Sequence, residues 1–264
     1  MDVEPMIPSQ VPFVVGNNGG GKDLHKGVII MDDGMEAEGG RRGKGRREVN
    51  RDSDMAMDGC LSSLARPVFQ GHFKRVVRES KPKLVALFEP RISGTRAAGV
   101  IRRLGLSQSF RVDGHGFSGG IWILWEDDLD VQLLRISNQF IHMRVVYSPS
   151  EPPVFVSAIY ASPNVSLRRF IWSQLITLDP GSDNAWILGS DFNAIYAPED
   201  RLGGARSKLD ISRGMENFVF EAVLSEVKFR GPRFTWKRGS LSQRLERCLA
   251  NERWLDRFPG GGAP

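Results

Sequence analysis

The sequence predicts a mixed α/β sandwich, in which groups of strands are bracketed by helices. Helical and strand-like hydrophobic patterns alternate from Phe69 onward, and several strand candidates follow one another in the middle of the chain. No repeat of about 20–50 residues is evident, which argues against a solenoid or propeller. Runs of strands without intervening helices favour the sandwich over a doubly wound parallel sheet.

Residues 1–58 differ from the rest of the chain in composition. They combine glycine with mixed charge, with an acidic patch at 32–38 and a basic run at 41–47. Such a segment buries too little apolar surface to offset the entropy of ordering, so we expect a disordered arm before a single domain at 59–264. The basic run is either a nuclear-import or nucleic-acid patch, or simply a solvated basic segment.

In the first half of the domain, the hydrophobic pattern predicts a helix, a strand and a second helix, followed by a group of strands. Apolar residues at helical spacing predict a helix beginning near Phe69, the apolar run 84–88 predicts a buried strand, and a helix over 94–104 ends at Gly105. Four strand candidates then follow, separated by polar turns, and predict an antiparallel meander: 120–125, 131–136, 140–147 and 154–160.

In the second half, Ser166 is positioned to cap a helix whose apolar face continues to Leu178 and leads into a strand near Trp186. A second helix is predicted from residue 211 or 213 to 224, with Phe218, Val219, Ala222 and Val223 facing inward. The remaining segments are predicted as a turn with a short strand at 229–236 and a helix at 241–249.

Charge and composition restrict the class of protein. Hydrophobic residues make up 41% of the 264 residues, enough for a substantial core. Residues 59–264 carry 28 basic and 20 acidic groups, which suits a polyanionic partner such as DNA or RNA. Two cysteines exclude a disulfide framework, and no secretory signal or membrane-length apolar run is present. We therefore expect a soluble, intracellular protein without a membrane partner.

Polar groups follow three of the predicted strands. Glu89 ends the strand 84–88, Tyr160 and Asn164 end the strand 154–160, and Asp191 with Asn193 follow the apolar run 185–189. Carboxylates from separate strands suit Mg²⁺, which prefers oxygen ligands and retains water for a substrate phosphate. Because Asp and Asn also begin turns, Asp191 and Asn193 alone are equally consistent with a turn.

Five segments in this order resemble the endonuclease/exonuclease/phosphatase family, most closely the endonuclease domain of plant non-LTR (LINE-type) retrotransposons. The resemblance extends from about residue 69 to 259. The segments that carry it are Leu87-Phe88-Glu89-Pro90-Arg91-Ile92-Ser93-Gly94, Gly116-Phe117-Ser118-Gly119-Gly120-Ile121-Trp122, Ile159-Tyr160-Ala161-Ser162-Pro163-Asn164, Gly189-Ser190-Asp191-Phe192-Asn193 and Gly231-Pro232-Arg233-Phe234-Thr235-Trp236.

The resemblance implies an α+β fold, a four-layer αββα sandwich with a site where the two sheets meet. Glu89 would ligate Mg²⁺, with Mn²⁺ as the alternative, and Asp191 would orient or deprotonate the attacking water. Asn193, Tyr160 and Asn164 would hold the scissile phosphate of a DNA backbone, and the protein would work in the nucleus. Taken singly, Glu89 could be a polar strand end, Tyr160 a half-buried aromatic and Asn164 a helix-entry residue.

The chain also departs from the family pattern. The stretch around residues 58–60 lacks the Asn that ends the family's first strand, so we expect an incomplete sandwich without that strand and without the C-terminal strands. The family's Arg-Leu-Asp-Arg segment is Arg244-Leu245-Glu246-Arg247 here, and the lengthened acid could reposition a hydrogen bond. No histidine follows His142, so no residue supplies the family's final Asp-His pair.

Three functions are therefore in competition. The first is a Mg²⁺-dependent DNA endonuclease domain of a retroelement, with activity impaired in this copy. The second is a catalytically dead remnant that at most binds nucleic acid, with His72, His115 and His142 in structural roles. The third is a phosphatase for a small phosphorylated substrate, which the segments at 116–122 and 234–236 disfavour.

Overall fold

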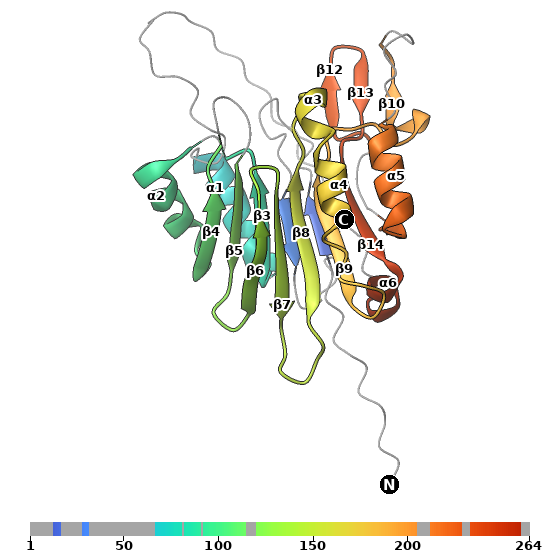
Figure 1. The fold of residues 1–264 in the computed structure, drawn as a ribbon. Helices are drawn as coiled ribbons and strands as arrows, with labels where there is room; N and C mark the ends of the chain where they lie inside the picture. Colours follow the sequence, from blue (N-terminus) through green and yellow to red (C-terminus); the bar gives the residue numbers. More distant parts are fainter. Residues whose placement is uncertain are drawn as a thin grey trace, which may run out of the picture.

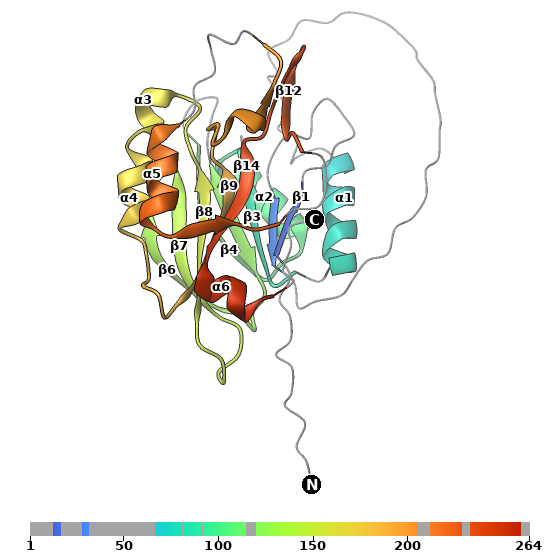
Figure 2. The same cartoon turned by 90° about the vertical axis from the view of Figure 1, so that its right-hand side faces the viewer.

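The computed structural model describes residues 13–16, 28–31, 67–80, 82–90, 92–114, 120–204, 212–228 and 233–259. Two sheets lie face to face and helices cover both outer faces, so the described chain forms four layers (Figures 1 and 2). This arrangement confirms the predicted α+β sandwich. Within the described segments, no helix is both long and apolar enough to cross a membrane.

The first sheet has the strand order β1-β2-β3-β5-β4, and all its neighbours are antiparallel. Its outer face is covered by α1 (Pro67–Ser80) and α2 (Gly94–Leu104), whose apolar residues pack against Trp122 and Leu124. The helix α2 ends as predicted, because Gly105 adopts a φ of 94° that favours glycine. The strands are β1 (Phe13–Gly16), β2 (Val28–Met31), β3 (Leu84–Phe88), β4 (Gln108–Val112) and β5 (Ile121–Trp125).

Two segments of the expected disordered arm form strands instead. Residues 13–16 and 28–31 pair with each other, and residues 28–31 pair with β3 along its length. Both segments are rich in β-branched residues, and residues 28–31 cover a backbone edge of β3 that would otherwise be exposed. The remaining residues of the arm lie outside the described part of the chain.

The second sheet has the order β11-β14-β9-β8-β7-β6, with β8 and β9 parallel and the other neighbours antiparallel. Outside it lie α4 (Ile171–Ile176) and α5 (Arg213–Glu221), while α3 (Val165–Arg168) follows β8 and α6 (Glu252–Arg257) follows β14. Its strands are β6 (Asp130–Ile136), β7 (Phe140–Val146), β8 (Val154–Tyr160), β9 (Ala185–Asp191), β11 (Leu224–Glu226) and β14 (Glu246–Asn251).

A small third sheet lies beyond the end of the sandwich where β8 and β9 finish (Figure 1). It contains β10 (Arg201–Leu202), β12 (Trp236–Arg238) and β13 (Leu241–Gln243), and the 3₁₀ helix η2 (Pro198–Asp200) precedes β10. These elements extend the chain around that end of the two main sheets.

Three predictions about the elements were wrong. The predicted meander holds for β6, β7 and β8, but β5 belongs to the other sheet, because the turn at residues 127–128 carries the chain across the sandwich. The predicted helix at 241–249 is the pair of strands β13 and β14, because this segment pairs with β9. Val223 is 74% exposed rather than inward, because α5 ends at Glu221.

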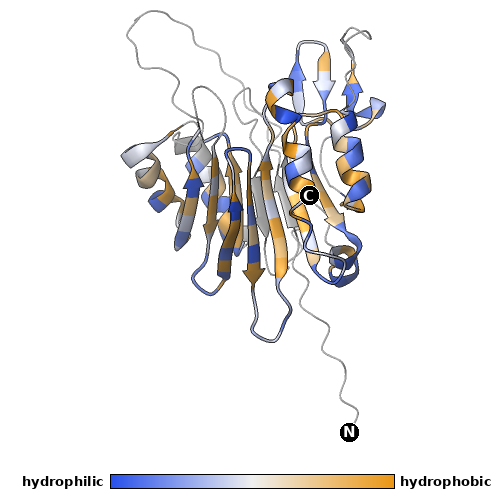
Figure 3. Ribbon diagram, viewed as in Figure 1, coloured by the Kyte–Doolittle hydropathy of each residue, from blue (hydrophilic) through white to orange (hydrophobic). Residues whose placement is uncertain are grey.

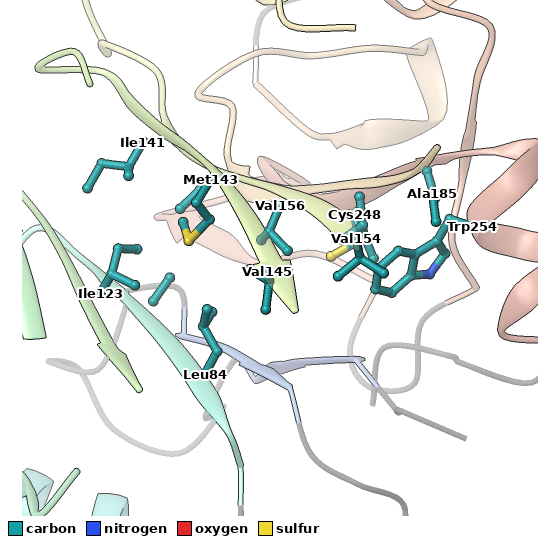
Figure 4. Close-up of a cluster of buried hydrophobic side chains, with 14 of the residues drawn as sticks. Leu84, Ile123, Ile141, Met143, Val145, Val154, Val156, Ala185, Cys248 and Trp254 are labelled. Carbon is teal, nitrogen blue, oxygen red and sulfur yellow. The ribbon is translucent and has the colours of Figure 1, made fainter. Parts of the chain in front are cut away.

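The main core fills the space between the two sheets. Its residues come from the facing sides of both sheets, with Leu84 and Ile123 from the first and Met143, Val156 and Trp254 from the second sheet and α6 (Figure 4). Figure 3 shows the hydrophobic residues concentrated on the strands and the hydrophilic residues in the loops that connect them. This packing holds the ends of β3, β8, β9 and β14 in fixed positions.

A buried polar group lies on the outer face of the second sheet. Ser157 Oγ is 2.8 Å from His142 Nδ1 and accepts a hydrogen bond from Trp186 Nε1 at 2.9 Å. His142 stacks on Phe155, and its burial, with a smaller effect from Arg135, lowers its pKa from 6.5 to about 4. His142 is therefore a neutral structural residue on the face opposite the sandwich interior.

Candidate active site

Three polar side chains form a row across neighbouring strands of the second sheet. Tyr160 on β8 pairs with Asp191 on β9, and Asp191 pairs with Glu246 on β14. Residues in register on adjacent strands share a face of the sheet. On the same face of these strands, Ala158, Ile187 and Cys248 belong to the core between the sheets, so all three side chains face the sandwich interior at its end.

Glu89 reaches the same place from the first sheet. It follows β3, and Tyr160 Oη donates a hydrogen bond of 2.5 Å to its Oε1, which links the two sheets. The Glu89 backbone has a φ of 50°, which is uncommon for a residue other than glycine, and its N–H donates to the Gly120 carbonyl at 3.0 Å. Backbone strain of this kind is often found at functional sites.

Asn193 is also held in a strained conformation, with a φ of 46°. Its backbone N–H donates to Asp191 Oδ1 at 2.9 Å, and its side-chain Nδ2 donates to the Ala161 carbonyl at 2.8 Å. The turn geometry expected of an Asp-x-Asn segment is therefore present. Because Ala161 directly follows Tyr160, the hydrogen bond from Asn193 Nδ2 ties the end of β9 to the end of β8.

Asn164 is the N-cap of a helix, which is the structural alternative to a phosphate contact for this residue. Its exposed side chain caps α3, with Oδ1 accepting hydrogen bonds from the backbone N–H groups of Ser166 at 2.9 Å and Leu167 at 3.4 Å. A phosphate contact by this residue stays a prediction.

Burial and mutual repulsion shift the two carboxyl groups of the row. Burial raises the pKa of Asp191 well above its ordinary value, and the nearby Glu246 raises it further, while the Asn193 N–H opposes the shift. Burial also raises the pKa of Glu246, against a hydrogen bond from Thr235 and with a further rise from Glu89. Both groups are therefore better proton acceptors than an ordinary surface carboxylate.

Arg168 and Glu246 belong to this site but were not among the predicted site residues. Arg168 is 8% exposed, donates to the carbonyls of Ser162 at 2.7 Å and Pro163 at 3.2 Å, and lowers the pKa of Asp191 through its charge. A basic residue a few positions after a strand-end motif is a weak sequence signal. Glu246 was identified only as a departure from the family pattern, because its segment was assigned to a helix.

The Arg244–Arg247 segment divides between the two faces of β14. Arg247 is 3% exposed and its Nη2 donates to Asp200 Oδ2 at 2.7 Å, while its guanidinium lies 5.4 Å from the centre of the Tyr196 ring. Arg244 forms an ion pair with Glu226. The Arg247 side chain therefore supports η2 through Asp200, the Arg244 side chain is paired with β11, and Glu246 faces the interior.

The donor set fits a hard divalent cation. Glu89, Asp191 and Glu246 offer only oxygen atoms, and Glu246 Oε2 is buried without a hydrogen-bond partner in the described part of the protein. Within those same residues, no three His, Cys, Asp or Glu side chains are arranged to hold one metal ion together. A cation here would thus be held by one or two carboxylates, with water and substrate oxygens completing its shell, as is usual for Mg²⁺.

The resemblance segments fall partly outside the described residues, at position 91, at 116–119 and at 231–232. No protein-family model matches the chain, and no curated protein matches it in sequence.

Solved structures do match. The endonuclease domain of TRAS1, a telomere-specific non-LTR retrotransposon, has a TM-score of 0.53 and 16% identity over 73% of this chain and 83% of its own. The AP endonuclease LMAP from Leishmania major has a TM-score of 0.54 and 11% identity over 76% of this chain and 81% of its own. At these identities the similarity concerns the fold. The chain therefore has the α+β sandwich fold of the endonuclease/exonuclease/phosphatase proteins.

Proposed function

We propose that the chain is a Mg²⁺-dependent phosphodiesterase domain that cleaves DNA and derives from a non-LTR retrotransposon endonuclease. The observation that carries this proposal is the convergence of Glu89, Tyr160, Asp191 and Asn193 at one end of the sandwich. They come from both sheets, and they are the residues to which the family resemblance assigns the chemistry.

In this proposal Glu89 holds Mg²⁺, or Mn²⁺ in its place, and Tyr160 positions Glu89 through the hydrogen bond to Oε1. The bound cation would neutralise charge on the scissile phosphate and on the leaving oxygen. Asp191 orients or deprotonates the attacking water, and its raised pKa makes it a stronger base than an ordinary surface carboxylate. Asn193 and Asn164 would donate side-chain N–H groups to phosphoryl oxygens. Tyr160 has a single hydroxyl hydrogen, so it would donate to a phosphoryl oxygen in exchange for its hydrogen bond to Glu89 when substrate binds.

A DNA substrate is supported by the charge around the site. Arg233, Lys237 and Arg238 are exposed on and beside β12, which lies at the same end of the sandwich as the ends of β8 and β9 (Figure 1). Cations in such positions bind a phosphate backbone without reading its sequence. A DNA substrate also favours the nuclear location predicted from the basic run at 41–47.

We expect the rate to be low. Family members pair an aspartate with a histidine at the scissile phosphate. Among the side chains that the structure describes, His142 is the one histidine, and it is buried on the outer face of the second sheet. The second candidate function, a remnant that binds nucleic acid without cleaving it, would retain the basic surface and lose the chemistry.

A nicking assay on supercoiled plasmid separates these two functions. We expect slow Mg²⁺-dependent conversion to open circle by the wild type, its loss in Asp191→Ala, and its retention in Asp183→Ala, which changes an exposed acid before β9. Equal background in the wild type and Asp191→Ala, with DNA binding retained, would instead support the remnant. Release of phosphate from a small phosphomonoester, without any nicking, would support a phosphatase.

A further inference from the structure

A hollow of about 460 Å³ lies at the end of the sandwich opposite the candidate active site. Its walls are the loop before β9, the turn between α5 and β11, and α6. Asp191 ends β9 and Glu246 begins β14, so the length of the second sheet separates the hollow from these residues (Figure 1). A ligand in the hollow would therefore leave the candidate active site open.

The hollow is acidic. Four carboxyl groups and one guanidinium, that of Arg253, line it and give it a formal charge of −3 on a chain whose net charge is +5. Among the residues that the structure describes, none of these carboxylates is in a salt bridge. The hollow therefore attracts a cationic ligand and repels a phosphate backbone. The carboxyl groups are those of Asp179, Asp183, Glu252 and Asp256.

A single metal ion is a poor match for this arrangement. No three of the described acidic, histidine or cysteine side chains are placed to hold one ion together. Because the hollow also repels phosphate, only water would complete the shell of a cation held by one of these carboxylates. Separated carboxylates match a ligand whose positive charges are also separated, as in the arginine and lysine side chains of a polypeptide.

Two apolar side chains are exposed beside these charges. Val223 lines the hollow, and Phe220, three residues earlier, is 84% exposed; they are the two most exposed large hydrophobic residues of the described chain. Val223 also has a φ of 49°, which is unfavourable for a β-branched residue. Its side chain thus gains little from folding, and exposed apolar groups rimmed by polar residues are typical of a protein–protein contact.

The hollow is already formed in the structure. The buried Asn251 side chain accepts hydrogen bonds from the backbone N–H groups of Trp186 and Trp254, each at 3.0 Å, and donates to the Asn184 carbonyl at 2.8 Å. These hydrogen bonds join α6 to the start of β9 and to the loop before it. A ligand would therefore bind without the cost of ordering the walls.

We propose that this hollow is the docking site of a basic segment of another polypeptide. Arginine or lysine side chains of the segment pair with the four carboxylates, and an apolar side chain of the segment covers Val223 and Phe220. Charge complementarity and the exposed apolar rim together select this occupant over DNA and over a metal ion. The docking site goes beyond the proposed function and does not depend on it.

Fluorescence anisotropy of a labelled peptide, with four arginines around a central leucine, measures docking on the full chain. The wild type should bind this peptide, bind it more weakly as salt is added, and bind a peptide with serine in place of leucine less tightly. A peptide with glutamates in place of the arginines should not bind. Equal binding of the arginine and glutamate peptides would overturn the proposal.

A charge reversal on α6 locates the binding to the hollow. Asp256→Lys lies in the last turn of the helix, where a cation is compatible with the helix dipole, and should weaken the arginine peptide by about fivefold or more. Asp130→Lys makes the same change of charge at an exposed residue of β6 and should leave the affinity unchanged. Equal weakening by both variants would show an effect of net charge alone and would refute the docking site.

Val223→Asn separates docking from folding. Asparagine tolerates a positive φ better than valine does, so the melting temperature should not fall. The affinity for the arginine peptide should fall by about threefold or more, because the apolar contact is lost. A lower melting temperature with unchanged affinity would assign Val223 to the fold and overturn the proposal.

Two other occupants would give different results. Sedimentation velocity without peptide should show no self-association through the hollow; self-association that Asp256→Lys abolishes would identify a second copy of this chain as the occupant. Displacement of the peptide by CaCl₂, but not by NaCl of equal ionic strength, would identify a cation site. Either result would overturn the proposal.

Discussion

Removal of the Tyr160 hydroxyl tests the connection between the two sheets at the site. In Tyr160→Phe the aromatic ring, which is 2% exposed as tyrosine, keeps its packing, while the hydrogen bond to Glu89 Oε1 is lost. The Glu89 carboxylate then lacks the hydrogen bond that links it to the second sheet at the partly buried end of the sandwich. We therefore expect a loss of stability without a change in the fold.

The size of the loss follows from the geometry. A hydrogen bond to a charged group contributes about 1.5–3 kcal/mol. Glu89 is only partly buried, so water replaces part of the interaction and the expected loss in unfolding free energy is about 1–2 kcal/mol. With a urea slope of about 2 kcal/mol per molar, the midpoint should fall by about 0.5–1 M.

Urea unfolding followed by tryptophan fluorescence measures this shift. Tyr196→Phe is the matched control, because it keeps the ring that lies against the Arg247 guanidinium, and it should change the unfolding free energy by less than about 0.5 kcal/mol. Equal midpoints for Tyr160→Phe and Tyr196→Phe would refute the reasoning. So would a change in the slope, which would indicate a different folded state.

Three further predictions concern parts of the fold away from the site. Ser157→Ala leaves the buried polar atoms of His142 and Trp186 without their partner, so the free energy of unfolding in urea should fall by about 2–5 kcal/mol. A fall of less than about 1 kcal/mol would contradict the assigned hydrogen bonds. Because the folded pKa of His142 is about 4 and the ordinary value is 6.5, the unfolded chain binds this proton more tightly. Stability should therefore fall by up to about 3 kcal/mol as pH decreases through this window, a slope that His142→Gln should lack. Gly214→Ala would place a Cβ 2.4 Å from Trp172 Cδ1, between α5 and α4. The free energy of unfolding should therefore fall by about 1–3 kcal/mol, measured by thermal unfolding. An unchanged melting temperature would show that the two helices separate freely.

The elements that sequence reasoning predicted correctly are those with strong local signals. The run 84–88 is a wholly buried strand with five apolar residues in succession, and α2 combines a regular apolar face with a glycine that ends it. In both cases the neighbouring residues alone determine the pattern. The alternation of helices and strands predicted a mixed α/β sandwich, and the family resemblance implied its four-layer α+β form.

The segment 241–251 was predicted incorrectly because its structure depends on distant partners. Leu241, Leu245 and Leu249 recur at helical spacing, yet Glu246–Asn251 is a fully buried strand. Charged residues such as Glu246 and Arg247 are unexpected in a buried strand. Their partners are distant in the sequence: Arg247 donates to Asp200, and Glu246 lies beside Asp191 and has a hydrogen bond with Thr235. The strands at 13–16 and 28–31 likewise depend on pairing with β3, which local composition does not reveal.

The site was only partly predictable for a related reason. Glu89, Tyr160 and Asp191 end apolar strands, so the sequence identifies them as polar groups at strand ends. That Glu246 faces Asp191 depends on the register between β14 and β9, and the contribution of Arg168 depends on the path of the chain after β8. Neither is encoded in a local pattern.

The most direct test of the proposed function is the initial rate of plasmid nicking with excess Mg²⁺, compared between the wild type and Asp191→Asn. The substitution keeps the size of the side chain and removes the base. If the site cleaves DNA, the rate of the variant should be lower by about a hundredfold or more, and EDTA should abolish the rate of the wild type. Equal rates in the two proteins would contradict the assignment of the reaction to this site.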